Sequence, residues 1–282
     1  MILFPNCKIN IGISVVEKRT DGYHNIETVF YPLAIEDALE AVLSPDGETK
    51  LHLSGTGMPC HCKLPSAAIG TWRETSQKNN LVIKAYTLLS QHFPLLPLHF
   101  YLHKVIPAEA GLGGGSSDAA CTLKMIDEMF QLSLSKQQLH SFAEQLGADC
   151  PFFIKNTPVF ATGKGDMFQK ITLDLSDYKI LIIKPPCPIS TKEAYNNIVP
   201  KKAKYPLSEA IKEPIFKWKN LIFNDFEAFA SAKYPEIKAI KETLYAHGAL
   251  YASMSGSGST VYGIFDRMPQ IPFSENYTIF QI

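Results

Sequence analysis

The sequence predicts a protein of mixed strands and helices that is large enough to form two lobes. The chain has 282 residues, which is long for one compact domain, and its hydrophobic content of 46% is enough for substantial cores. Apolar and polar residues alternate with the period of a strand in residues 7–16 and 98–106. In residues 81–93 and 116–130 the apolar residues instead recur at helical spacing. We therefore expect strands and helices to be interspersed along the chain.

Charge and composition argue against several classes of protein. Lys+Arg and Asp+Glu number 27 each, so the formal net charge is zero, which disfavours a nucleic-acid-binding or membrane-surface protein. No apolar run is long enough to span a bilayer, and the first ten residues lack the pattern of a signal peptide. The six cysteines lie mostly singly in apolar segments, as reduced cysteines do, so we expect a cytoplasmic protein. Cys60-His61-Cys62 has ligand-like spacing, but no second cluster completes a zinc site, and we interpret it as loop sequence.

The N-terminal segments predict strands. In residues 7–16 isoleucine and valine alternate with polar residues, which predicts a half-buried strand with Lys8 and Asn10 on one face. From spacing alone, a solvated polar face is the commoner explanation for those two residues. Residues 26–43 predict further strand, with Pro32 as an interruption.

Turns and an irregular connection follow. Asp21-Gly22 predicts a tight turn, and Tyr23 and His24 lie beside it as rings that could stack on a planar ligand or merely pack. Residues 54–79 hold no period and predict a long surface connection. Asn79-Asn80 then caps the helix predicted over residues 81–93.

The most distinctive stretch is PAEAGLGGGSSDAA, residues 107–120. Four glycines fall between Gly111 and Gly115, after a predicted strand and directly before the helix expected over Ser116–Phe130. A loop with so few side chains lets backbone N–H groups approach a ligand closely, and the opening of a helix adds further donors and a positive dipole end. The strand, glycine loop and helix together predict a phosphate-binding site.

Three common glycine loops do not fit this stretch. A Walker A loop needs a lysine that is missing after Gly115. A Rossmann loop needs glycine where Ser116 stands. A protein-kinase loop lies between two strands and comes with a catalytic-loop aspartate and a D-F-G motif, neither of which accompanies it here.

The second half of the chain predicts alternating helices and strands. Ser135 to Gln138 forms a capping box for a helix that Gly147 ends, and Asp149 follows as an isolated acid. An N-cap of a short helix explains Asp149 as well as a functional role does. The remaining expectations are a turn at 161–166, a strand at 179–184, a short helix at 190–195, a mobile Lys- and Pro-rich stretch at 200–219, a helix at 235–248, and strands at 250–254 and 260–265 around a second glycine loop, 255–259, that is a tight bend or a backbone anion site.

Four motifs together resemble the GHMP superfamily of small-molecule kinases. PAEAGLGGGSSDAA resembles the second motif of that family, and SGSGS at residues 255–259 resembles the third. Lys8-Ile9-Asn10 followed by Asp21-Gly22-Tyr23-His24 resembles the N-terminal motif of one branch, and LGADCPFF at residues 146–153 resembles the motif with the catalytic aspartate. The resemblance spans nearly the whole chain and implies an α+β, two-lobed GHMP kinase fold. It implies mixed or antiparallel sheets packed with helices, an N-terminal lobe at 1–155, a C-terminal lobe at 156–282, and an active site in the cleft between them.

Asp-Gly-Tyr-His and Gly-Ala-Asp-x-Pro-Phe-Phe resemble the branch whose members phosphorylate the 2-hydroxyl of a cytidylylated methylerythritol in the non-mevalonate route to isoprenoid precursors. The resemblance implies ATP as the phosphate donor and Mg²⁺ held mainly by phosphate oxygens and water. It implies a small-molecule substrate, with no nucleic acid, no membrane and no obligate protein partner. The alternatives are another GHMP kinase of the mevalonate or homoserine type, and a non-catalytic nucleotide sensor. A sensor is expected to lose Lys8 or Asp149, and both are present.

The resemblance also assigns roles to residues. Asp149 would accept the hydroxyl proton and Lys8 would stabilise the developing charge. Asp118 is expected in the first helical turn, either as a complement to the dipole or near Mg²⁺. ATP binding is expected from Asn80, Leu81, Lys104, Pro107, Ala108, Glu109, Ala110, Gly111, Leu112, Gly113, Gly114, Gly115, Ser116 and Ser117. Substrate binding is expected from Asn10, Tyr23, His24, Thr191 and Tyr195.

Overall fold

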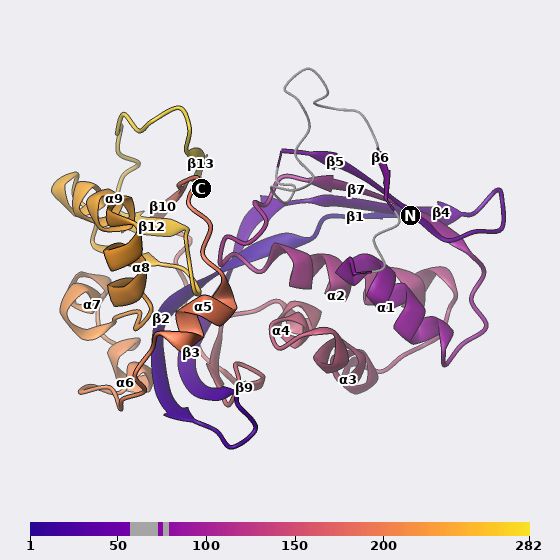
Figure 1. Cartoon of the computed structure of the whole chain (residues 1–282), viewed down its shortest axis with the longest axis horizontal. Coiled ribbons are helices and arrows are strands. Elements are labelled where there is room, and N and C mark those ends of the chain that lie inside the picture. Colours follow the sequence, from indigo (N-terminus) through magenta and orange to yellow (C-terminus); the bar gives the residue numbers. More distant parts are fainter. Residues whose placement is uncertain (57–72, 76–78) are drawn as a thin grey trace. The chain divides into compact units, whose positions relative to one another are not determined.

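The computed structural model describes residues 1–56, 73–75 and 79–282, and these residues pack into two compact units. Unit 1 contains Met1–Cys7, Ala34–Ala108 and Gly113–Thr157, and unit 2 contains Lys8–Leu33, Glu109–Leu112 and Pro158–Ile282. Each unit combines helices with β-sheet, as the predicted α+β class requires (Figure 1). The division into lobes at 1–155 and 156–282 stays a prediction. In the described part of the chain, no helix has the length and apolar character needed to cross a membrane.

Unit 1 is a mixed sheet with helices on one face (Figure 1). β4 and β7 are antiparallel, whereas β5 and β7 are parallel. The strand order is β1 (Ile2–Leu3), β4 (Ala38–Leu43), β7 (Leu98–Lys104), β5 (Lys50–Gly55) and β6 (Arg73–Thr75). The helices are α1 (Leu81–Ser90), α2 (Gly114–Met129), α3 (Lys136–Leu146) and α4 (Cys150–Lys155).

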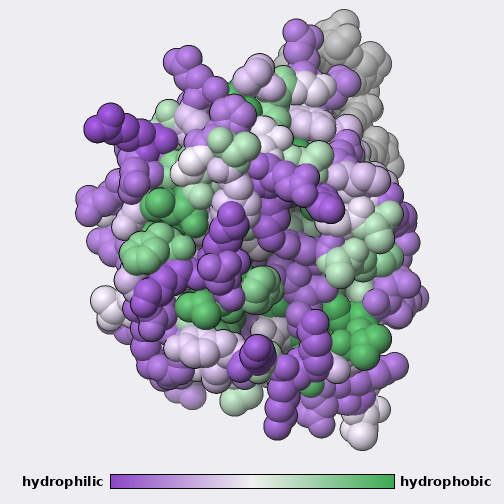
Figure 2. Space-filling view, turned by 90° about the vertical axis from the view of Figure 1, so that its left-hand side faces the viewer, coloured by the Kyte–Doolittle hydropathy of each residue, from purple (hydrophilic) through white to green (hydrophobic). Residues whose placement is uncertain are grey.

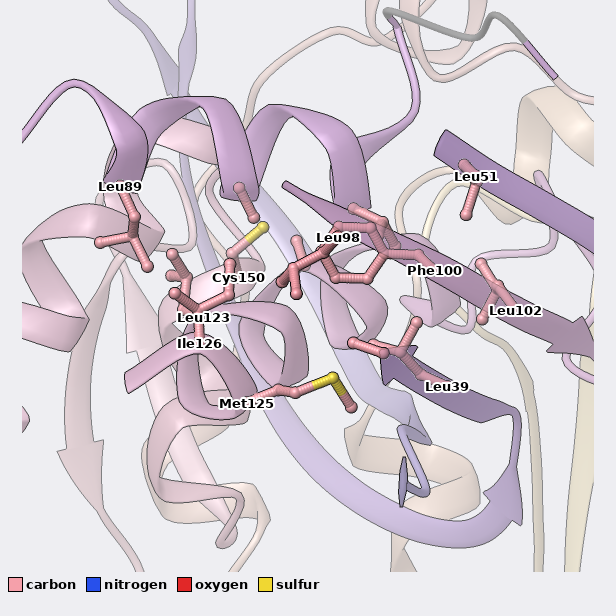
Figure 3. Packing of buried hydrophobic residues seen from close by; sticks show 14 of the residues in the cluster. Leu39, Leu51, Leu89, Leu98, Phe100, Leu102, Leu123, Met125, Ile126 and Cys150 are labelled. Carbon is pink, nitrogen blue, oxygen red and sulfur yellow. The ribbon is translucent and has the colours of Figure 1, made fainter. Parts of the chain in front are cut away.

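The core of unit 1 lies between this sheet and α2. Leu39 and Phe100 from the sheet and Leu123 and Ile126 from α2 are fully buried in one cluster (Figure 3). Successive side chains of a strand point to opposite faces, so the alternating apolar residues of β7 all face the helices. Burial of one such large apolar side chain contributes roughly 1.5–3 kcal/mol, which makes this core a firm base for the loop between β7 and α2.

Unit 2 contains two sheets and the remaining helices. The first sheet has the order β2 (Asn6–Lys18), β3 (His24–Glu36), β8 (Val159–Thr162) and β9 (Met167–Lys170). The second has the order β11 (Tyr251–Met254), β12 (Val261–Phe265), β10 (Lys179–Lys184) and β13 (Thr278–Gln281). The helices are α5 (Thr191–Asn196), α6 (Leu207–Ala210), α7 (Ile215–Leu221), α8 (Glu227–Lys233) and α9 (Pro235–Ala246).

The core of unit 2 joins the second sheet to α8 and α9. Ile183 from β10, Val261 from β12 and Leu244 from α9 are fully buried in it. On the side of the molecule shown in Figure 2, hydrophilic residues surround small, separate groups of hydrophobic ones. Apolar surface divided in this way is normal for a folded protein.

Two strand predictions need correction. β2 was expected to be half-buried, but Cys7 to Ile13 are buried on both faces, because the polar residues of this stretch hydrogen-bond inside the protein. β3 runs unbroken through Pro32. β8 pairs with Thr28 to Phe30, so Pro32 lies beyond that ladder.

The stretch 200–219 was expected to be mobile, and this prediction is wrong. It contains α6 and most of α7, and Trp218 of α7 is 1% exposed. The indole N–H of Trp218 donates to the carbonyl oxygen of Glu213, so its one polar group is satisfied. The prediction was wrong because it relied on the many lysines and prolines of the stretch and overlooked the apolar residues that anchor these helices.

The irregular connection at 54–79 is described only in part. Within it, Arg73–Thr75 forms β6, which pairs with β5 in antiparallel fashion. Cys60-His61-Cys62 and most of the connection lie outside the described residues.

Candidate functional site

The glycine-rich stretch joins β7 to α2, as the sequence predicts. α2 begins at Gly114, two residues before the expected start at Ser116. Its N-cap, Gly113, has a φ of 72°, in the left-handed region that favours glycine. The N–H groups of Gly114, Gly115 and Ser116 lack an acceptor within the helix because they belong to its first turn. The start of α2 therefore offers backbone donors and a positive dipole end to an anion.

The earlier start of α2 also changes the place of Asp118. Asp118 was expected in the first helical turn, but four residues of α2 precede it, so it lies in the second turn. The side chain there is too far from the helix terminus to complement the dipole strongly. This finding weakens one of the two roles considered for Asp118.

Gly114 and Gly115 differ in the space around them. A Cβ atom on Gly114 would lie 2.8 Å from Cγ2 of Ile106, so packing inside the protein requires glycine there. A Cβ atom on Gly115 would meet its nearest neighbour, Cδ1 of Leu81, at 3.7 Å, which is an ordinary contact. Unit 1 thus brings Leu81, predicted to contact adenine, next to the loop. Asn80 precedes it as the N-cap of α1, and its Oδ1 accepts the N–H of Val82 at 2.9 Å.

Lys104, predicted to contact ATP, is engaged in buried ion pairs. Its Nζ contacts the carboxylate of Asp37 and lies 2.7 Å from Oδ2 of Asp118. Burial by itself lowers the pKa of Lys104, but the two carboxylates outweigh burial, and the pKa lies above its ordinary value. Burial raises the pKa of Asp118 to about 7, with Lys104 opposing the rise and Asp37 adding to it. The contact of Lys104 with adenine stays a prediction.

Asp149 lies at the N-cap position of α4, but its side chain accepts no capping hydrogen bond. The next residue, Cys150, is buried, and burial raises the pKa of its thiol, while Ser116 at the start of α2 opposes that rise. Lys124 of α2 also donates to the carbonyl oxygen of Phe153 in α4 at 2.6 Å. Unit 1 therefore joins the segment that carries Asp149 to α2, and the role of Asp149 as the base stays a prediction.

Lys8 and Asn10 lie on one face of β2, as the alternation predicts, and the structure joins them directly. Nζ of Lys8 donates to Oδ1 of Asn10 at 2.5 Å and lies 4.8 Å from the ring centroid of Phe30. Nδ2 of Asn10 donates to Thr28, whose hydroxyl donates to the carbonyl oxygen of Gly12. Both side chains are 3% exposed, so the solvated face suggested by spacing is wrong. Lys8 lies in unit 2 and Asp149 in unit 1, and that the two meet stays a prediction.

Residues 109–112 of the first glycine loop contact the second glycine loop inside unit 2. Oγ of Ser255 donates to the carbonyl oxygen of Gly111 at 2.8 Å and accepts the N–H of Asn10 at 3.1 Å. The N–H of Lys8 donates to the carbonyl oxygen of Leu112 at 2.9 Å. A Cβ atom on Gly111 would lie 2.1 Å from the carbonyl oxygen of Ser255, so only glycine permits this contact. The predicted tight bend is confirmed.

Sequence reasoning missed several residues that hold this arrangement. Nδ2 of Asn224 donates to the carbonyl oxygens of Met254, at the end of β11, and Gly256, inside the bend. The hydroxyl of Tyr262 donates to the carbonyl oxygen of Asn10. Asn224-Asp225 interrupts an apolar run, which was a local signal for a cap, but nothing in the sequence pairs Tyr262 with Asn10.

The aromatic residues predicted to bind substrate are brought together in unit 2. The rings of His24 and Tyr195 are stacked, with centroids 5.1 Å apart and an interplanar angle of 27°. Burial lowers the pKa of His24, and the nearby Lys18 lowers it further, so the imidazole is neutral at pH 7. Tyr23 is exposed, with Nζ of Lys164 5.1 Å from its ring centroid. The predicted Thr191 bonds to Ser257 in the second glycine loop, with 2.9 Å between the hydroxyl oxygens.

In the described ranges, no group of three or more His, Cys, Asp or Glu side chains is arranged to hold a metal ion.

Comparison with known proteins places this architecture among phosphate-transferring enzymes. The family model for the GHMP kinases N terminal domain matches residues 80–157, and the model for GHMP kinases C terminal matches residues 209–274. A relative from Bacteroides thetaiotaomicron is 51% identical over 272 residues, which are 96% of this chain and 94% of the relative. The chain therefore belongs to the GHMP kinases, which are small-molecule phosphotransferases.

The relative from Bacteroides thetaiotaomicron is named 4-diphosphocytidyl-2-C-methyl-D-erythritol kinase. A solved structure of 4-(cytidine 5'-diphospho)-2C-methyl-D-erythritol kinase is similar with a TM-score of 0.75 and 27% identity, and the match covers 94% of this chain and 90% of that one. The mevalonate kinase of Methanococcus jannaschii is similar with a TM-score of 0.66 and 13% identity, covering 100% of this chain and 97% of that one. The second similarity supports the fold alone, and it confirms the predicted GHMP fold.

Proposed function

We propose that this chain transfers the γ-phosphoryl group of ATP to the 2-hydroxyl of 4-diphosphocytidyl-2-C-methyl-D-erythritol, giving the 2-phosphate and ADP. The observation that carries this proposal is the 51% identity over 96% of the chain to a relative named for that substrate. The product would enter the non-mevalonate route to isoprenoid precursors. The described cysteines Cys7, Cys121, Cys150 and Cys187 are free thiols, which supports a reducing, cytoplasmic location.

The triphosphate would lie at the start of α2. The backbone N–H groups of its first turn are suited to an anion, and Gly115, which is exposed and has no side chain, allows close approach of a phosphate. Residues 107–117 would bind the phosphates, and Asn80, Leu81 and Lys104 would lie on the nucleoside side. Mg²⁺ would be held mainly by phosphate oxygens and water, since Asp118 is already paired with Lys104.

Asp149 and Lys8 would carry the chemistry. As the 2-hydroxyl oxygen forms its bond to the γ-phosphorus, the bond to the β–γ bridging oxygen breaks, ADP leaves, and Asp149 takes the hydroxyl proton. Lys8 would stabilise the charge that develops on the transferred group. The hydrogen bond from Lys8 to Asn10 supports this role because it orients the ammonium group before substrate binds.

The cytidine end would be recognised by Tyr23, His24, Thr191 and Tyr195, with Asn10 contacting the polyol. Stacking on an aromatic ring contributes roughly 1–3 kcal/mol per base in comparable sites. The stacked pair of His24 and Tyr195 supports the proposal, because it supplies a flat face and a neutral imidazole that can both donate and accept hydrogen bonds.

The test is a comparison of phosphate acceptors. Purified protein is given ATP and Mg²⁺ with the cytidylylated methylerythritol, with mevalonate or with homoserine, and ADP release is measured beside ³¹P NMR of the product. We expect turnover with the first acceptor alone, a new monoester at its 2-position, and loss of turnover in EDTA. Phosphorylation of mevalonate or homoserine alone would contradict the proposal. Binding of ATP without turnover of any acceptor would identify a nucleotide sensor instead.

A further inference from the structure

We propose that Asp37 is a positioning residue for the ATP loop, because its buried carboxylate ties together the two chain segments between which the loop is suspended. Asp37 lies between β3 and β4, far from the loop in sequence, and it is 1% exposed. The inference rests on the proposed function, since it takes the loop between β7 and α2 to be the ATP site.

The first tie is to the segment that enters the loop. Oδ1 of Asp37 accepts the N–H groups of Val105, at 2.6 Å, and Ile106, at 2.9 Å. These two residues directly follow β7 and precede Pro107, so their amides have left the sheet ladder. The backbone N–H of Asp37 itself donates to the carbonyl oxygen of Pro5 at 2.8 Å. The carboxylate therefore fixes the direction in which the chain leaves β7.

The second tie is to the helix that leaves the loop. The other carboxylate oxygen of Asp37 contacts Nζ of Lys104, and the same Nζ lies 2.7 Å from Oδ2 of Asp118 in α2. The second oxygen of Asp118, Oδ1, is buried without a hydrogen-bond partner among the described residues. Among the described residues, the hydrogen bond to the Asp118 carboxylate therefore comes from Lys104. The ammonium group of Lys104 in turn contacts two carboxylates, and Asp37 supplies the second of them. This chain of contacts sets the position of α2 relative to the end of β7.

The loop itself has little else to hold it within unit 1. Gly113, Gly114 and Gly115 have no side chains, and the proposed phosphate contacts are backbone N–H groups. Backbone N–H groups can bind the phosphates only if the backbone itself is correctly positioned. A misplacement of about 1 Å in such a site can lower the rate about 10²-fold. Loss of the charge on Asp37 would leave the Lys104 ammonium with one carboxylate in a buried site, which favours rearrangement. We therefore expect loss of this charge to weaken binding of the nucleotide and not binding of the second substrate.

The experiment compares Asp37→Asn with Asp46→Asn. Asparagine at 37 keeps the volume and one oxygen for the two amides but removes the charge that faces Lys104. Asp46, in the bend between β4 and β5, is the control. It accepts Nζ of Lys50 at 2.6 Å and the N–H of Glu48 at 3.1 Å, and it contacts His99 at the end of β7 away from the loop. Calorimetry gives the Kd for ADP in EDTA and the Kd for the cytidylylated substrate, and steady-state kinetics gives kcat and both KM values.

For Asp37→Asn we expect the Kd for ADP and the KM for ATP to rise about tenfold or more, with kcat at saturating ATP within about threefold of the unaltered protein. The Kd for the second substrate stays within about twofold, and Asp46→Asn leaves all these constants unchanged. If Asp37 had a purely structural role, Asp37→Asn would lower the thermal unfolding temperature and the fraction of active protein. The folded fraction of the variant would then keep the original Kd for ADP. An unchanged Kd for ADP in folded Asp37→Asn overturns the inference.

If Asp37→Asn does not fold, Asp118→Asn tests the same tie from the helix. ADP in EDTA remains the ligand, because loss of a magnesium ligand cannot alter binding that involves no magnesium. A rise in this Kd supports the inference, and an unchanged Kd overturns it. Turnover by the unaltered protein decides the proposed function separately. If the unaltered protein binds ADP but phosphorylates nothing, the proposed function fails while the ratio of the two Kd values still decides the role of Asp37; if it does not bind ADP, both are overturned.

Discussion

At the scale of single residues, the side chains proposed to do the chemistry have neighbours that limit their motion. Lys8 donates to Asn10, which donates in turn to Thr28. Asp149 precedes α4, which Lys124 of α2 joins by a hydrogen bond to the carbonyl oxygen of Phe153. Groups held in this way lose little further freedom when substrate binds, which is how preorganisation lowers a barrier.

Asp149→Asn is expected to reduce kcat about 10³-fold while the Kd for ADP stays within about twofold. The side chain of Asp149 accepts no capping hydrogen bond, so the change removes the base and keeps the start of α4. Steady-state turnover and calorimetry check this prediction, and Asp174→Asn, at an exposed acid in unit 2, is the control. A nearly normal rate would exclude Asp149 as the base.

His24→Ala is expected to raise the KM for the cytidylylated substrate about tenfold and to leave the KM for ATP unchanged, because a stacking surface of roughly 1–3 kcal/mol is removed. His140→Ala serves as the control, since His140 lies in α3 beside Glu144. Equal effects of His24→Ala on both KM values would remove His24 from the cytidine site.

At the scale of elements, the strand–loop–helix connection must both pack against its own unit and leave room for a ligand. Two adjacent glycines meet these two requirements. Gly114 lets α2 pack against Ile106, whereas a Cβ atom on Gly115 would make only an ordinary contact with Leu81. The first glycine is therefore needed for packing, and the second is free for the ligand. Substitution of the first glycine should therefore change stability, and substitution of the second should change nucleotide binding.

Gly115→Ala is expected to maintain or raise the free energy of unfolding, since alanine is favoured over glycine in a helix by about 1 kcal/mol. The added methyl group would enter the proposed phosphate site and raise the KM for ATP about tenfold. Gly114→Ala is expected to lower the free energy of unfolding by about 1–3 kcal/mol, because Ile106 must move. Thermal unfolding and ATP kinetics on both variants check the pair, and a normal KM for ATP in Gly115→Ala would exclude close phosphate approach there.

Helix α7 offers a second matched pair. Trp218→Ala is expected to cost about 3–5 kcal/mol of unfolding free energy, because a fully buried indole leaves a cavity. Phe216→Ala, in the same helix, should change it by less than about 0.5 kcal/mol, because Phe216 is 64% exposed. Denaturant titration of both variants gives the comparison, and similar values for the two would mean that α7 does not anchor the segment.

At the scale of the whole molecule, the buried charges of unit 1 affect stability as a function of pH. Asp118 has a pKa of about 7 in the folded protein, above its ordinary 3.8, chiefly because of burial. The folded state therefore binds the extra proton between these two values. The stability from this group is fully present below pH 3.8 and is lost as the pH rises through about 7.

The free energy of unfolding of the unaltered protein should therefore fall, relative to that of Asp118→Asn, as the pH rises from 4 to 7, with a slope of up to about 1.4 kcal/mol per pH unit. The reason is that asparagine does not titrate, so the difference between the two proteins isolates the carboxyl group. Denaturant titrations at several pH values measure this difference. A difference that is constant with pH would show that the pKa of Asp118 is not raised.

Most local structure could be predicted from the sequence, because it depends on residues close together in the chain. The caps at Asn80 and Ser135, the turn after β2 and the strand–loop–helix order are all confirmed. The short edge strands β1 and β13 were missed, since two or four residues carry too little pattern. The helices α6 and α7 were missed because their apolar anchors are spaced among lysines and prolines.

The sequence by itself indicated the family, predicted phosphate binding at the loop and placed Lys8 and Asn10 on one strand face, because motifs and alternation are local. Only the tertiary structure decided what surrounds those residues. Asp37 meets Lys104 across 67 positions, and Ser255 meets Gly111 across 144. Such contacts arise from the packing of sheets and helices, and buried polar groups must find partners wherever that packing places them. The spacing of residues within one segment of the sequence therefore cannot predict these long-range contacts.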